Sequence, residues 1–293
     1  MVRLIPVLLL FATASIHAAT WFDGEPDYAD AASRALAAEV LEAHGGMQGM
    51  TNAKSIRFSF FTKVIGGQRP FYSIETVDLE TGNAYLEWPF WDSTVALSND
   101  EIWARHWPMP MPAGFFARLS ASFMTLPWQM HADGANVGPV STGKLPDDDT
   151  AYDVLRVTFD QGSPSIPGTY YDIFVDRETH LVKGVGFDIN HPGMVANPNQ
   201  PSGPNYHVFG EYRRVDGLLI PVFYLTHGGG SNAYHFAWDV SLDQPFDSGM
   251  LVAPPDATLD EVSMQWWGLA GTGTQSSAVV IDRGPHTDNG ESK

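Results

Sequence analysis

A histidine followed by three glycines, at residues 227–230, is the part of the chain that most resembles catalytic machinery. In lipases and esterases this motif supplies backbone N–H groups that stabilise a negatively charged oxygen. Such an enzyme also needs Gly-x-Ser-x-Gly, and residues 229–233 around Ser231 lack the last glycine. Three glycines between two apolar runs suit a tight turn between strands. We therefore predict a turn and no catalytic residues, and keep a secreted hydrolase as an alternative.

Metal chemistry has equally weak support in the sequence. The chain has no Cys and no His-Glu-x-x-His motif, so thiolate sites and the common zinc protease site are excluded. His106, Met109 and Met111 are the soft ligand types that copper prefers, but alternating prolines favour an extended connection there. Asp147–Asp149 is interpreted as a solvated acidic loop, and no two carboxylates stand out as a glycosidase pair. We expect no metal and no cofactor.

Aromatic residues between positions 88 and 128 form the most informative cluster. Each ring taken alone suits an ordinary core, whereas together they match the lining of a cavity for an apolar guest. The C-terminal strand pattern adds a second aromatic set on alternating positions. The predicted ligand-binding residues of the cavity and its lid are Trp88, Phe90, Trp91, Trp103, Trp107, Phe115, Phe116, Leu119, Phe123, Trp128, Tyr234, Phe236 and Trp238.

These side chains must be positioned by strands. Residues 170–247 contain successive period-two runs joined by turn residues, which predicts a meandering antiparallel sheet. In the last strand Tyr234, Phe236 and Trp238 share one face, and His235 and Ala237 share the other. Earlier period-two strands are predicted at 54–64, 71–79, 83–88, 93–98, 101–107, 135–141 and 151–159.

Two helices are predicted. The first lies at 27–46, with acids at its start and Gly45 and Gly46 at its end, as helix termini prefer. The second lies between Pro112 and Pro127, where apolar residues recur at steps of three and four. It interrupts the strand pattern, so we expect it to act as a lid over the apolar face.

The ends and the charge of the chain indicate its compartment. Residues 1–19 have one basic residue, an apolar run and small residues at the end, which is typical of a cleavable signal peptide. We expect one domain over residues 20–265 and a flexible tail over 266–293. The net charge of −18 disfavours nucleic acid and anionic membrane surfaces as partners. The predicted location is the periplasm of a Gram-negative bacterium.

The order of these features resembles the LolA-like superfamily of periplasmic lipoprotein carriers, and its uncharacterised members most of all. The resemblance runs through STVALSNDEIWARHW, YYDIFVDRETHLVKGVGF and FDSGMLVAPPDATLDEV, and EYRRVDGLLIP is typical of those uncharacterised members. It implies a curved, incomplete antiparallel barrel whose concave apolar face is closed by helices and holds acyl chains. One departure is the early-strand arginine tied to lipoprotein release in the carriers, since VDLETGNAYLEW has none.

The resulting prediction is a mainly β (α+β) fold, a LolA-like half-barrel with an N-terminal helix and a short helical lid. Its predicted function is that of a periplasmic carrier of a lipid, an acyl chain or a lipoprotein's lipid moiety, without catalysis. The expected partners are a lipid or an acylated protein, with envelope proteins as further candidates, no nucleic acid and no membrane-spanning segment. The alternatives are the hydrolase and a cell-envelope interaction module whose barrel is filled by its own side chains.

Overall fold

The structure is a computed structural model that describes residues 22–269, except 23, 25, 68, 99–100, 110, 133, 161–169, 189–203, 229–231 and 268. The expected signal peptide at 1–19 and Ser231 lie outside the described residues. So do most of the tail 266–293 and most of the loop 190–205. No helix among the described residues is long and apolar enough to cross a membrane.

Strands dominate the described part of the chain. In order they are β1 (Asp27–Tyr28), β2 (Ser55–Val64), β3 (Phe71–Asp78), β4 (Ala84–Trp88), β5 (Ser93–Leu97), β6 (Ile102–Arg105), β7 (Ala135–Val137), β8 (Ser141–Gly143), β9 (Tyr152–Phe159), β10 (Tyr170–Val175), β11 (Val182–Phe187), β12 (Asn205–Val215), β13 (Leu218–His227), β14 (Ala233–Leu242) and β15 (Thr258–Leu259).

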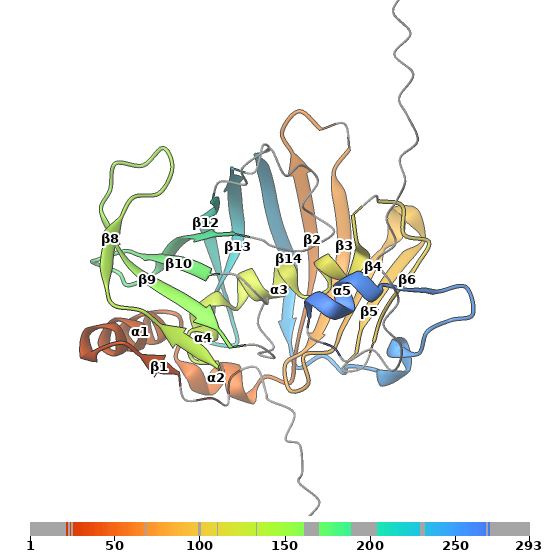
Figure 1. Cartoon of the computed structure of the whole chain (residues 1–293), viewed down its shortest axis with the longest axis horizontal. Helices are drawn as coiled ribbons and strands as arrows, with labels where there is room; N and C mark the ends of the chain where they lie inside the picture. The colour runs from red at the N-terminus through yellow and green to blue at the C-terminus, as the bar shows by residue number, and fades with distance from the viewer. Residues whose placement is uncertain are drawn as a thin grey trace, which may run out of the picture.

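The strands form one open sheet in the order β1-β7-β9-β10-β11-β12-β13-β14-β2-β3-β4-β5-β6-β15, with β8 paired to β9. Every neighbouring pair is antiparallel except β1 and β7. The two terminal strands of the order do not pair with each other, so the sheet curves without closing (Figure 1). This confirms the predicted incomplete antiparallel barrel.

Register explains which residues face inward. The chain reverses between β13 and β14 so that Thr226 pairs with Ala233. His227 ends β13, and Gly228 follows it at a φ of 108°. Strand β14 pairs with β2, which is far from it in sequence, and His235 lies opposite Thr62. The meander of β9 to β14 is thereby joined to the meander of β2 to β6 in one continuous surface.

Short helices cover this surface. They are α1 (Ala31–Ala43), α2 (Met47–Asn52), α3 (Leu119–Met124), α4 (Leu126–Gln129) and α5 (Glu261–Trp266), with 3₁₀ turns η1 (Pro89–Trp91), η2 (Ala113–Phe116) and η3 (Ser248–Leu251). In α1 the Asp30 carboxylate accepts the Ser33 N–H at 2.8 Å, which caps the helix start. The helix ends before Gly45, at a φ of 101°.

The single helix expected between Pro112 and Pro127 is instead three pieces, η2, α3 and α4. Pro127 is accommodated in the first turn of α4, where its missing N–H costs nothing. Helix α3 packs against β13 and lies across the front of the sheet (Figure 1). Its residues from Ser120 to Met124 are all buried. This helix is therefore part of the core, and in η2 only Phe116 keeps the half-buried position that a lid needs.

Candidate functional site

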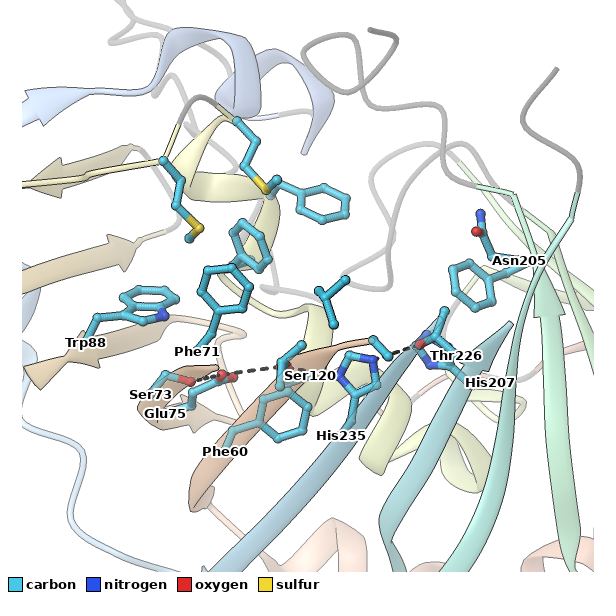
Figure 2. Close-up of a pocket in the computed structure, with 18 of the residues that line it drawn as sticks. Phe60, Phe71, Ser73, Glu75, Trp88, Ser120, Asn205, His207, Thr226 and His235 are labelled. Carbon is cyan, nitrogen blue, oxygen red and sulfur yellow. Dashed lines mark hydrogen bonds between the residues drawn. The ribbon is translucent and has the colours of Figure 1, made fainter. Parts of the chain in front are cut away.

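The concave face of the sheet encloses a cavity of about 390 Å³ (Figure 2). Its walls come from β2, β3, β4, β11, β12, β13 and β14, and from the segment 109–120. Most of the wall is apolar, and its largest side chains are Phe60, Phe71, Trp88, Phe115, Phe116 and Phe187. We call the face of β2, β3, β4 and β14 that borders this cavity the hollow half.

Alternation along the strands directs these side chains into the cavity. On β2 the residues Phe60, Thr62 and Val64 line it, as their shared face in the sequence predicts. On β3 the same alternation brings Phe71, Ser73 and Glu75 to the wall. Exposure falls along both strands, from half-buried Val64 and Phe71 to Glu75 at 2% exposed. The cavity is therefore open near the turn between β2 and β3 and closed near Glu75.

A group of aromatic rings forms the wall opposite β2. The Trp88 ring lies 4.9 Å from that of Trp107 and 6.3 Å from that of Phe116, measured between centroids. Phe115 and Phe116 meet edge to face at 5.0 Å. The Trp107 indole N–H donates to the backbone oxygen of Met111 at 2.7 Å, which fixes the segment that carries the two methionines of the wall.

The 3₁₀ turn η2 is held away from the middle of the sheet by α5. The Gly114 N–H donates to the Asp260 carboxylate at 2.8 Å, and the Trp267 indole N–H donates to the Gly114 oxygen at 2.9 Å. A Cβ at position 114 would lie 2.5 Å from the Ser263 Cβ, so only glycine permits this approach. Because η2 is fixed on α5, its side chains do not reach across the cavity.

One carboxyl group lies at the closed end of the cavity. The Ser73 hydroxyl donates to Glu75 Oε1 at 2.7 Å, and the Ser120 hydroxyl donates to the same oxygen at 3.3 Å. The other oxygen, Oε2, is buried and has no hydrogen-bond partner among the described residues. Burial raises the pKa of Glu75 to about 7, although the two serine hydrogen bonds lower it.

Two histidines line the cavity on the side of β12 and β14. The ring nitrogens of His235 bond the hydroxyls of Thr62 at 2.9 Å and Thr226 at 2.7 Å. His207 stacks on Tyr224 with 4.6 Å between ring centroids, and its Nδ1 is buried without a partner among the described residues. Burial lowers the pKa of His235 to about 4 and that of His207 well below its usual value. Both rings are therefore neutral at pH 7.

Three of the sequence-predicted ligand-binding residues line the cavity, namely Trp88, Phe115 and Phe116. Trp107 packs behind them, and half-buried Trp91 lies 5.7 Å from the Phe71 ring. The structure brings these residues together, as the clustering of aromatic residues in the sequence suggests.

Phe123, Leu119 and Trp128 belong to the core and do not line the cavity. The Phe123 ring on α3 lies within 6.5 Å of four rings on β10 to β13: Tyr171 at 6.4 Å, Phe187 at 4.9 Å, His207 at 4.1 Å and Tyr224 at 6.2 Å. Trp128 is fully buried and donates its indole N–H to the Gly46 oxygen at 2.9 Å. We call this part of the face, covered by α3 and α4, the filled half.

The remaining predicted residues face away from the cavity. Ala233 and His235 line it, so the alternating residues Tyr234, Phe236 and Trp238 lie on the outer face of β14, where Trp238 stacks on Tyr72 at 5.5 Å. These three residues are therefore not part of the cavity wall.

Phe90 and Trp103 are also outside the cavity wall. Phe90 is 77% exposed. Trp103 pairs with Ala96, and Ala96 pairs with Tyr85, so these three side chains share one face of the sheet. Leu86, the neighbour of Tyr85, is on the other face, which is the inner one. There its indole N–H donates to the Leu251 oxygen at 2.7 Å.

Sequence reasoning missed Glu75, His207 and His235. The signal for Glu75 was present, since FYSIETVD alternates and puts a glutamate in phase with Phe71 and Val77. A charged residue type on the inward face of a strand is uncommon unless it is paired or has a specific role. The alternation on β14 also placed His235 on one face with Ala237, but the opposite, aromatic face was taken as the inner one.

The residues weighed for catalysis or metal binding have other contacts. His227 Nδ1 lies 3.7 Å from Asp147, and His106 lies between Asp92 at 3.3 Å and Asp256 at 3.4 Å. Met109 and Met111 line the cavity instead of facing His106 as ligands would. No group of three or more metal-ligating side chains occurs among the residues that the structure describes.

Comparisons with known proteins found no matching family model and no matching curated protein. Among solved structures, a LolA superfamily protein from Nitrosomonas europaea has a TM-score of 0.47 at 10% identity, covering 74% of this chain and 97% of that one. A DUF1329 family protein from Desulfovibrio piger also has a TM-score of 0.47 at 10% identity, covering 75% and 97%.

A putative outer membrane lipoprotein-sorting protein domain from Vibrio parahaemolyticus has a TM-score of 0.44 at 10% identity, covering 74% of this chain and 94% of that one. Each of these three likenesses covers about three quarters of this chain.

Proposed function

We propose that this protein binds the hydrocarbon chain of a lipid or of an acylated protein in the cavity of the hollow half, as a carrier without catalysis. The observation that carries the proposal is the cavity itself. It lies on the concave face of the sheet, is walled mainly by aromatic and aliphatic side chains, and opens near the turn between β2 and β3.

The size of the cavity suits a single chain. Its volume of about 390 Å³ falls in the lower part of the range of small-molecule sites, about 300–1,000 Å³. Ten methylenes moved from water into such a wall contribute about 8 kcal/mol at 0.8 kcal/mol each. Part of that gain offsets the lost translational and rotational freedom of the guest. We therefore expect micromolar or weaker binding of a ten-carbon chain.

The proposed setting of this activity follows from the sequence. A leader at residues 1–19 directs export, and the net charge of −18 disfavours lasting attachment to anionic membrane surfaces. A periplasmic carrier with these properties takes up a lipid or an acylated protein and releases it elsewhere in the envelope. The neutral floor formed by His207 and His235 suits a guest held by burial.

Titration with Nile red, an uncharged dye whose fluorescence rises in apolar surroundings, tests the proposal. The wild-type protein should take up one dye per chain, and 1-decanol should displace it. Phe116→Asp places a charge in the half-buried wall and should weaken dye binding about tenfold or more, since a charge in an apolar site costs well over the 1.4 kcal/mol that corresponds to tenfold.

Phe90→Asp is the matched control, because Phe90 is 77% exposed and outside the cavity. It should leave dye binding unchanged. Absence of dye uptake by the wild type, or an equal loss in both variants, would overturn the proposal.

A further inference from the structure

Three polar side chains of the cavity wall, Thr62, Asn205 and Thr226, are half-buried, and another polar group lies at the closed end. Glu75, Ser73 and Ser120 are connected by hydrogen bonds there, and each is less than 8% exposed. Val64, Phe71 and the two methionines line the wall nearer the opening. Glu75 follows Phe71 by four residues, which is about 13 Å along a strand. The long axis of the cavity therefore runs from a half-buried mouth to a buried end that holds a carboxyl group.

Two buried polar atoms of the residues that line the cavity have no hydrogen-bond partner among the described residues. They are Glu75 Oε2, at the closed end, and His207 Nδ1, on β12. Both side chains line the cavity (Figure 2). A buried polar atom without a hydrogen bond destabilises a fold, so a bound group that supplies the bond is favoured there.

The charge at this end is negative or zero. The pKa of Glu75 is raised to about 7, so its carboxyl group is largely ionised at pH 8. The two histidines are neutral at that pH. None of the described lining residues is Lys or Arg. Lys63 lies on β2 between the lining residues Thr62 and Val64, so its side chain faces the other side of the sheet. Its ammonium group donates to the Gly67 oxygen.

We propose that the closed end of the cavity selects the head group of the guest, and that it accepts a hydrogen-bond donor without negative charge, an alcohol or an amine. This inference rests on the proposed function, since it names the chemistry of the same guest. The head donates to Glu75 Oε2, and the hydrocarbon chain extends toward Val64 and Phe71. A carboxylate or phosphate head would face a carboxyl group with no cation in the described wall, so anionic amphiphiles bind poorly.

Isothermal titration calorimetry at pH 8 with 1-decanol, decylamine and decanoate tests this inference. The three probes share one chain length and differ only in the head. The affinity of the wild-type protein for decanol and for decylamine should exceed its affinity for decanoate by about tenfold or more. One buried hydrogen bond that is satisfied corresponds to about a tenfold change in affinity. Glu75→Gln removes the charge with little change of shape, and should reduce the advantage of decylamine over decanoate to about threefold or less.

Glu87→Gln is the matched control, because Glu87 lies on β4 next to inward-facing Leu86 and so faces the other side. It should leave all three affinities unchanged, and melting curves establish that each variant is folded. Equal binding of all three probes by the wild type, or tightest binding of decanoate, would overturn the head-group preference alone. Binding of none of them would overturn the proposed function as well.

Discussion

The filled half and the hollow half of the concave face are built from the same kind of strand and differ in what covers them. In the filled half α3 inserts Phe123 among four aromatic or imidazole rings, and Met124, Leu126 and Trp128 are each at most 1% exposed. In the hollow half the covering turn η2 is bonded to α5, and a cavity of about 390 Å³ remains beneath it.

Protein interiors are normally packed without voids larger than a water molecule, so a cavity of this size is a structural feature of its own. The two halves differ in the contacts of their covering segments. Helix α3 packs on β13, whereas η2 packs on β5 and β6 and its Gly114 lies against Ser263 and Asp260.

The largest expected effect separates the two halves by stability. Phe123→Ala should lower the free energy of unfolding by about 3–5 kcal/mol, as large-to-small changes at buried aromatics do. Phe116→Ala should cost about 1 kcal/mol, since that ring is half-buried against an existing cavity. Urea denaturation of both variants measures the two values. Equal losses would show that the hollow half is as tightly packed as the filled one.

A smaller effect comes from the carboxyl group of the hollow half. The folded protein binds the Glu75 proton more tightly than the unfolded chain, because its pKa rises from 4.5 to about 7. Its favourable contribution is therefore fully present below pH 4.5 and is lost as the pH rises through 7. The total change is about 3 kcal/mol, at 1.36 kcal/mol for each pH unit.

The difference between the wild type and Glu75→Gln isolates this contribution from the buried histidines, whose lowered pKa values instead destabilise the fold in acid. Unfolding free energies at pH 5 and pH 8 should show Glu75→Gln gaining stability relative to the wild type at the higher pH. A constant difference between the two pH values would mean that Glu75 ionises as an exposed glutamate does.

The smallest effect contrasts the two faces of one strand. Tyr234→Ala removes a ring that is 45% exposed and stacked on Phe223 across the outer face, and should cost at most about 1 kcal/mol, the value of one cross-strand pair. It should leave the affinity for 1-decanol unchanged. His235→Ala, one residue further, opens the floor of the cavity and should alter that affinity. Calorimetry on both variants gives the comparison, and an altered affinity in Tyr234→Ala would place the guest on the outer face.

Much of the fold was predictable because strand alternation is a local property. The inward set of β2, from Ile56 to Val64, and the antiparallel meander of the C-terminal strands both follow from period two. The broken form of the segment from Pro112 to Pro127 was not predictable, because its apolar spacing fits one helix. Only the tertiary contacts of Gly114 with α5 show why the first part leaves the helical path.

The site was predictable only in part. Aromatic clustering pointed to Trp88, Phe115 and Phe116, which do line the cavity. The alternation of residues along a strand does not determine which face of the sheet is concave. On β14 one face carries Tyr234, Phe236 and Trp238 and the other carries His235, and the more aromatic face was taken as the inner one. Glu75 and the two histidines were missed because they lie on strands far apart in sequence, which border one cavity only through the order of the strands.

The most direct test of the account is a crystal structure of the protein with 10-bromo-1-decanol, whose bromine is located by its anomalous scattering. We expect one molecule per chain in the hollow half, with the hydroxyl at hydrogen-bond distance from Glu75 and the bromine near Val64 and Phe71. A bromine peak on the outer face of β14, or no bound molecule at saturating concentration, would contradict the claim that the hollow half is a binding site.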